Sequence, residues 1–221
     1  MGTQGGPEYP CIQEGLVFCF DPANPKSAPS ISGNTTTVYN MVNNASGSTS
    51  FSAPSADEWD YARSDEGYIQ YDGTDDLISI ADTGVPMGDS ARTVSVWANW
   101  VNKNQYASAI IYGTAVGSGT CALNLSNDPN NYFKASFWAN EFDSTVSPSL
   151  DTWYNVTFTY EGGTDGAVEL FVNGSSILTG TKTLNTTSTG NGVAFGSFYV
   201  GYTYDFEGKI GPGYIYNRAL S

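Results

Sequence analysis

The chain has 221 residues, with 8 basic and 22 acidic side chains, no histidine and a formal net charge of −14. Hydrophobic residues make up 40% and charged residues only 14%, which excludes a solvated, disordered coil. The acidic excess excludes nucleic acid and an anionic membrane surface as partners, because both are bound by clustered Lys and Arg. The length allows a sizeable core and is typical of one all-β domain.

The predicted elements begin after an N-terminal arm. Residues 1–14 are predicted to lack a core of their own, and residues 15–221 to form a single domain. The first strand is expected at 16–20. Residues 22–58, rich in Pro, Ser, Asn and Thr, are predicted to be a long surface connection with one short strand at most.

The remaining chain reads as short strands separated by Gly, Asn, Asp and Pro. The pattern is clearest in 152–160, where Tyr154, Val156, Phe158 and Tyr160 fall on one face of a strand. The pair Asn173-Gly174 predicts a type I′ hairpin, since both turn residues must adopt positive φ. Other strands are expected at 68–71, 77–80, 93–101, 109–112, 120–125, 132–138, 167–172, 175–178, 194–201 and 209–216. Together they predict two antiparallel sheets packed face to face.

Cysteine and histidine usage restricts the chemistry. Cys11, Cys19 and Cys121 have no Cys-x-x-Cys spacing and predict neither a zinc site nor a disulfide framework. The interpretation is three reduced, mostly buried thiols, with one disulfide pair as the alternative. The absence of histidine excludes Ser-His-Asp and Cys-His catalysis. The first residues carry neither the basic nor the apolar region of a secretory signal peptide, so folding in a reducing compartment is expected.

Eight segments, in order along the chain, resemble motifs of the laminin-G-like, concanavalin A-like jelly-roll family, in the version found in virion proteins of tailed bacteriophages. They are 15–27 (GLVFCFDPANPKS), 38–41 (VYNM), 71–78 (YDGTDDLI), 94–98 (VSVWA), 151–160 (DTWYNVTFTY), 170–174 (LFVNG), 206–210 (FEGKI) and 214–221 (YIYNRALS). One departure is Gly211-Pro212-Gly213, which stands where the family has Asp-Glu-Val, so an acidic or metal-binding role there is lost.

The resemblance implies an all-β, two-sheet antiparallel jelly-roll sandwich. It further implies a non-enzymatic structural protein of a phage virion, either a capsid decoration protein or a fibre-like surface component. On this hypothesis the protein assembles in the host cytoplasm and lies on the virion surface. Its partners would be major capsid or tail proteins, with a homo-oligomer as a further expectation. Tyr9, Pro10, Cys11 and Ile12 are the predicted apolar anchors of a docking arm.

Hydrolysis is the best-known chemistry of this fold, and it needs two carboxylates about 5 Å apart. On one strand face that requires acids at positions i and i+4. Glu58-x-Asp60 and Glu141-x-Asp143 begin the pattern, but Ala62 and Thr145 occupy the fourth position after each glutamate. The sequence therefore predicts that the protein is not an enzyme.

The alternative function is a carbohydrate-binding, lectin-like module that attaches to host or environmental glycans. Aromatic platforms beside Asn and Asp suit sugar rings, and Trp59, Trp100 and Trp138 lie on the less constrained segments. Trp97 and Trp153 lie within the family motifs and are assigned to the core of the sandwich.

Calcium is the only ion that the sequence suggests. Asp72, Asp75 and Asp76 cluster closely, and carboxylate oxygens suit Ca²⁺. The alternative is a hairpin turn in which these aspartates accept hydrogen bonds from backbone N–H groups. No other cofactor is expected.

Overall fold

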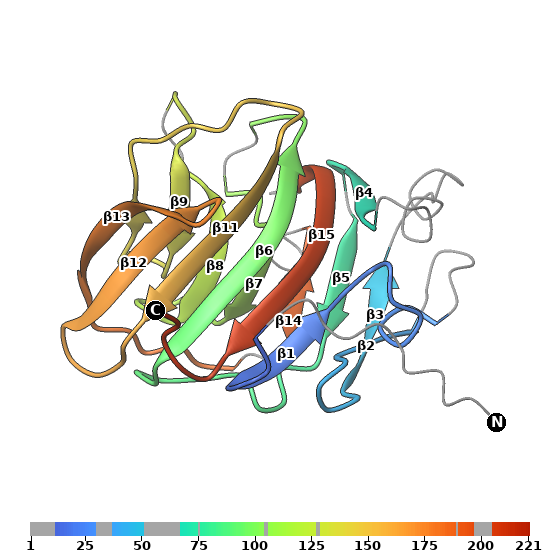
Figure 1. The fold of residues 1–221 in the computed structure, drawn as a ribbon, viewed down its shortest axis with the longest axis horizontal. Coiled ribbons are helices and arrows are strands. Elements are labelled where there is room, and N and C mark those ends of the chain that lie inside the picture. Colours follow the sequence, from blue (N-terminus) through green and yellow to red (C-terminus); the bar gives the residue numbers. More distant parts are fainter. Residues whose placement is uncertain are drawn as a thin grey trace.

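A computed structural model of the chain describes residues 12–29, 37–50, 67–74, 76–103, 106–126, 129–188, 190–196 and 205–221. Within these ranges the chain forms fifteen strands and no helix, so no described helix could cross a membrane. The strands form two antiparallel sheets that pack face to face (Figure 1). This confirms the predicted all-β sandwich.

The sheet that faces the viewer in Figure 1 has seven strands. In spatial order it contains β1 (Leu16–Phe20), β15 (Glu207–Tyr216), β6 (Arg92–Trp100), β11 (Trp153–Tyr160), β12 (Gly166–Val172) and β13 (Ser175–Lys182), with β4 (Ile69–Asp72) also paired to β15.

The second sheet lies behind the first and has eight strands. Its spatial order is β10 (Phe142–Asp143), β9 (Phe133–Ser136), β8 (Thr120–Leu125), β7 (Ile110–Gly113), β14 (Val193–Phe195), β5 (Leu77–Ile80), β3 (Ser46–Ser50) and β2 (Thr37–Tyr39).

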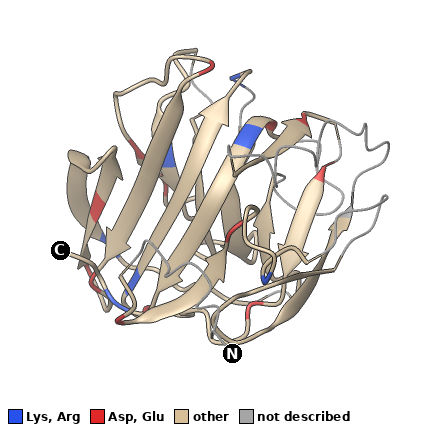
Figure 2. Ribbon diagram, turned by 45° about the vertical axis from the view of Figure 1, so that its right-hand side comes forward, with Lys and Arg blue, Asp and Glu red and all other residues tan. Residues whose placement is uncertain are grey.

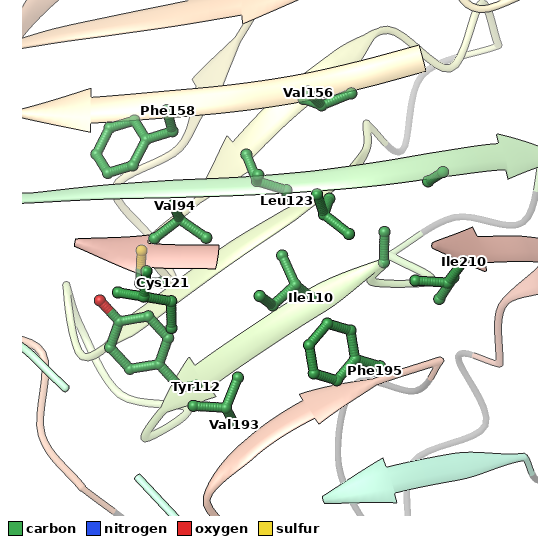
Figure 3. Close-up of a cluster of buried hydrophobic side chains, with 14 of the residues drawn as sticks. Val94, Ile110, Tyr112, Cys121, Leu123, Val156, Phe158, Val193, Phe195 and Ile210 are labelled. Atoms are coloured by element: carbon green, nitrogen blue, oxygen red, sulfur yellow. The ribbon is translucent and has the colours of Figure 1, made fainter. Parts of the chain in front are cut away.

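Side-chain alternation explains why the strands pack as a sandwich. On β6, Val94, Val96 and Ala98 are fully buried, and on β11 the same holds for Phe158 and Tyr160. Figure 3 shows such side chains from both sheets meeting in one core. The hairpin at Asn173-Gly174 is also as predicted, with φ values of 51° and 75°.

The prediction for the early part of the chain was wrong in one respect. The 22–58 connection contains two strands, β2 and β3, which form the edge of the eight-stranded sheet. The sequence of β3 is Ser-Gly-Ser-Thr-Ser, which has no apolar alternation, and its pairing with β5 is what makes it a strand. The division into arm and domain at residue 14 stays a prediction.

A buried polar cluster lies within the core. The Arg92 side chain is fully buried, and its guanidinium donates to the Tyr112 hydroxyl and to Thr186 Oγ1. Cys121 lies next to Tyr112, as the labelled side chains in Figure 3 show. Burial raises the pKa of the Cys121 thiol to about 11, so this thiol is protonated at neutral pH. Cys19 is also buried, whereas Cys11 lies outside the described residues.

Candidate functional site

The structure separates the three tryptophans predicted to bind sugar. Trp59 lies outside the described residues. Trp138 is partly buried on the outer face of the eight-stranded sheet, against a small cluster that includes Ile111 and Ala122. Trp100 is only 1% exposed and packs between Phe133 and Phe206, so it cannot offer a ring face to a ligand. The prediction for Trp100 was therefore wrong.

Trp97 is the exposed tryptophan that the sequence prediction missed. It was assigned to the core, but its side chain lies on the outer face of the seven-stranded sheet and is 42% exposed. The signal was present in the sequence. Val94, Val96 and Ala98 mark one face of β6, and strand alternation puts Trp100 on that inner face and Trp97 on the other.

Two further aromatic rings lie on the outer face near Trp97. Trp153 on β11 is partly exposed, and its ring centroid is 5.6 Å from that of Tyr68, the residue before β4. Gly211 on β15 lies beneath both tryptophans, since a Cβ there would lie 3.3 Å from Trp97 Cβ and 3.7 Å from Trp153 Cζ3. We call the exposed Trp97 and the partly exposed Trp153 the aromatic patch; Tyr68, which is only 3% exposed, supports Trp153 from below.

The segment Gly211-Pro212-Gly213, which departs from the family motif, has a structural role. The register of β15 against β6 shifts between Ile210 and Gly213, which marks a bulge opposite Trp97. A Cβ at Gly213 would lie 2.5 Å from the ring of Phe195 in the core, so glycine is required there. Glycine at 211 lets the two tryptophan side chains lie close against the backbone of β15.

A row of polar side chains borders the aromatic patch. Asn99 on β6 pairs in register with Trp153 on one side and with Lys209 on the other, and Lys209 pairs with Gln70 on β4. Side chains that lie directly opposite each other point to the same face. Within the described part of the chain, the side chains of Asn99, Lys209 and Gln70 make no hydrogen bond to another residue. Asn99 is 5% exposed, and its Oδ1 is buried without a partner.

On the neighbouring part of the same face, the polar side chains do have hydrogen-bond partners. Ser95, Asn155 and Thr157 lie on β6 and β11 beside Trp97, and their side chains bond to one another. The Ser95 and Thr157 hydroxyls are 2.7 Å apart, Asn155 Nδ2 donates to Ser95, and Thr157 donates to Asn155 Oδ1. Unused hydrogen-bonding capacity is therefore concentrated next to Trp153, where an incoming polar ligand could satisfy it.

Two of the predicted calcium residues, Asp72 and Asp76, lie where the chain passes from β4 to β5. Asp76 Oδ2 accepts from the backbone N–H of Asp72, and Asp72 Oδ1 accepts from that of Thr74. These bonds match the alternative in which aspartates accept from backbone donors, but β4 and β5 belong to different sheets, so the turn is not the predicted hairpin. Asp75 lies outside the described residues, and the described ranges contain no group of three acidic or sulfur ligands that could hold a metal. Calcium binding stays a prediction.

Glu141 and Asp143, the acidic residues of the predicted pair beside β10, share one lysine. Lys134 Nζ lies 3.0 Å from Glu141 Oε2 and 3.7 Å from Asp143 Oδ1, and the lysine side chain is only 4% exposed. A carboxylate pair that shares a buried cation is arranged as an ion-pair network. Glu58 and Asp60 lie outside the described residues.

The remaining predicted site is the docking arm. Tyr9, Pro10 and Cys11 lie outside the described residues, and Ile12 is 51% exposed. Figure 2 shows that the charged residues lie mainly in loops and near strand ends, while the middle of each sheet is nearly free of charge. The outer face around Trp97 is therefore aromatic and polar.

A hollow lies over β3 and β5 of the eight-stranded sheet. It has a volume of about 410 Å³ and is lined by small and hydroxyl-bearing residues, among them Ser46, Ser48, Ser79 and Asn191. The Ser79 hydroxyl donates to the Asn191 carbonyl oxygen. Among the described residues that line this hollow, none is aromatic or charged.

Several solved structures share this fold. Domain 4 of AbnA, a GH43 extracellular arabinanase from Geobacillus stearothermophilus, in complex with arabinotriose, is 19% identical with a TM-score of 0.61, covering 93% of this chain and 94% of that one. The binding domain of Paraclostridial Mosquitocidal Protein 1 is 15% identical with a TM-score of 0.63, covering 94% and 50%. Trypanosoma rangeli sialidase in complex with sialic acid is 16% identical with a TM-score of 0.60, covering 94% and 31%.

The chain thus spans about half of the mosquitocidal binding domain structure and about a third of the sialidase. Comparison with curated protein sequences finds no relative. The sequence model of the concanavalin A-like lectin/glucanases superfamily matches residues 72–221, which is more than half of the chain. The chain belongs to the concanavalin A-like lectin/glucanases superfamily.

Proposed function

We propose that this protein is a non-enzymatic carbohydrate-binding module, and that its binding surface is the aromatic patch with the adjoining Asn99. The observation that carries the proposal is the exposed Trp97 ring near an amide oxygen that has no partner. Indole rings present a flat apolar face on which the C–H groups of a sugar can stack. Asn99 Oδ1 is buried in the structure, so a hydroxyl group of the same sugar would donate to it after a small side-chain shift has uncovered this atom.

Energetics favour a ligand at this position. A buried polar atom without a hydrogen bond costs about 1–3 kcal/mol, and Asn99 Oδ1 is such an atom. A sugar hydroxyl that reaches it would remove this cost in addition to forming a bond. Ligand sites in proteins combine apolar and aromatic walls with a few convergent polar groups, as this surface does. The arabinanase domain, which has the same fold, is a structure with an oligosaccharide bound.

The test is the substitution Trp97→Ala, measured on a glycan array and then by calorimetry with each glycan bound. We expect a loss of about 2 kcal/mol or more, roughly 30-fold in Kd, because a single aromatic anchor dominates such sites. Stability should change by less than about 1 kcal/mol, since the ring is exposed.

Trp138→Ala is the matched control, because Trp138 is a second surface tryptophan on the opposite sheet. Binding retained in Trp138→Ala and lost in Trp97→Ala supports the proposal. Loss only in Trp138→Ala would place the sugar site on the eight-stranded sheet and contradict it.

The virion role predicted from the motif resemblance concerns location, and it is compatible with glycan binding. A capsid decoration or fibre-like protein can also attach to glycans. Counting the copies of this protein in purified particles, relative to the major shell protein, tests it. A high fixed ratio is expected for a decoration protein and a few copies for a fibre, whereas absence from particles contradicts the virion role.

A further inference from the structure

Lys209 is unusual among the cations of this acidic chain. It lies on a strand, within the polar row, and its Nζ is 4.8 Å from the centroid of the Tyr68 ring. Within the described ranges this is the only interaction that its ammonium group makes, and no carboxylate lies within ion-pair distance. The other three cations on described strands, Arg92, Lys134 and Lys182, each make a hydrogen bond or an ion pair, whereas the Lys209 ammonium makes neither with a described residue.

The other described cations on strands, and Arg218 just after β15, have partners. Lys134 pairs with Glu141 and Asp143, and Arg218 lies 3.9 Å from Glu14. Lys182 donates to Asn140 Oδ1 and to the Glu141 carbonyl oxygen. Arg92 is buried among hydroxyl and carbonyl oxygens. The remaining two, Lys26 and Lys103, lie in loops.

The nearest acid along β15 is directed elsewhere. Glu207 lies two residues before Lys209 and shares its face of the strand. Its Oε2 accepts a hydrogen bond of 3.0 Å from Asn102 Nδ2. The carboxylate is thereby held toward the loop after β6, and no carboxylate of the described residues pairs with the Lys209 ammonium.

The two neighbours of Lys209 complete the recognition chemistry. Asn99 and Gln70 flank it in register, and side chains directly opposite each other have Cβ atoms about 4.5–5.5 Å apart. A ligand held there meets an ammonium donor between two carboxamides, each of which can donate and accept. A carboxylate would accept from the Lys209 ammonium and the amide N–H groups, while a hydroxyl of the same sugar donates to Asn99 Oδ1.

We propose that the ligand is an acidic glycan whose sugar carboxylate is bound by Lys209, between Asn99 and Gln70, while the ring stacks on the aromatic patch. This inference rests on the proposed carbohydrate-binding function and specifies its substrate class. The overall charge of −14 opposes long-range attraction of such a ligand. The attraction between the Lys209 ammonium and the sugar carboxylate therefore acts only at close range. Added salt is expected to weaken it only moderately.

The experiment measures binding of the intact chain to paired glycans that differ only in the acid. Oligogalacturonate is compared with its methyl ester, and sialyllactose with lactose, with heparin fragments as the sulfated arm. The variants are Lys209→Met, which keeps the apolar stem and removes the charge, Lys209→Arg, which keeps the charge, and Trp97→Ala. A charge-assisted hydrogen bond of ordinary strength predicts about a tenfold or greater loss for Lys209→Met on the acidic member.

The outcomes separate the two proposals. Binding to a carboxylated glycan that Lys209→Met weakens, Lys209→Arg largely keeps and Trp97→Ala abolishes supports both. Binding of neutral glycans that depends on Trp97 and not on Lys209 overturns the acidic class alone. A preference for the sulfated arm also overturns the carboxylate assignment. Absence of binding to every glycan overturns the carbohydrate-binding function itself.

Discussion

Replacing Trp100 by alanine is expected to lower the free energy of unfolding by about 3–5 kcal/mol, the range for truncating a buried aromatic side chain. The indole is 1% exposed, and its ring centroid lies 5.7 Å from those of Phe133 and Phe206. Truncation would leave a cavity where β6, β9 and the residue before β15 meet. Urea unfolding followed by circular dichroism measures the change.

Trp100→Phe is the control for this effect. The Trp100 Nε1 is buried without a hydrogen-bond partner, so phenylalanine removes an unsatisfied donor while it keeps most of the apolar ring. We expect a much smaller loss than for alanine. If Trp100→Ala unfolded like the wild type but failed to bind glycans, Trp100 would be a ligand residue after all, and its assignment to the core would be wrong.

Replacing Arg92 by methionine is expected to cost at least about 3 kcal/mol, because several buried oxygens would lose their donor at once. Arg92 Nε donates to the Ser90 carbonyl oxygen at 2.9 Å, and Nη2 donates to that of Gly88 at 2.7 Å. Nη1 donates to Thr186 Oγ1 at 2.8 Å. The guanidinium thus connects the segment before β6 to the one after β13.

No carboxylate in the described ranges forms an ion pair with Arg92. Its charge is offset by carbonyl and hydroxyl oxygens and by the Tyr160 ring, whose centroid is 5.7 Å from Cζ. Arg92→Lys should therefore lose less than Arg92→Met, since it keeps the charge but not the forked set of donors. Thermal unfolding of the three proteins gives the order, and equal stability of Arg92→Met and the wild type would contradict the network.

Much of the fold followed from local patterns. Alternating apolar residues in 153–160 and the pair Asn173-Gly174 are sufficient to predict strands and a hairpin, because each depends on neighbours in the chain. Strand β3 could not be found in this way. Its Ser-Gly-Ser-Thr-Ser sequence has no strand pattern, and only the backbone bonds to β2 and β5 define it.

The candidate site also has features that the sequence could predict and features that it could not. The exposure of Trp97 and the burial of Trp100 were both implied by the sequence, because Val94, Val96 and Ala98 mark the inner face of β6. The prediction for the two tryptophans was wrong because it placed each one according to whether it lies inside the family motif at 94–98. The alternation of side chains along β6 was not used.

The row of neighbouring residues that crosses four strands at the candidate site could not be inferred from the sequence. Gln70, Asn99, Trp153 and Lys209 come from four strands, separated by up to 139 positions between Gln70 and Lys209. The sequence by itself determined the sandwich and the face on which each β6 side chain lies, since both depend on the period of a strand. Only the tertiary structure brought these four residues together, because strand order and register depend on long-range pairing and on the bulge at 211–213.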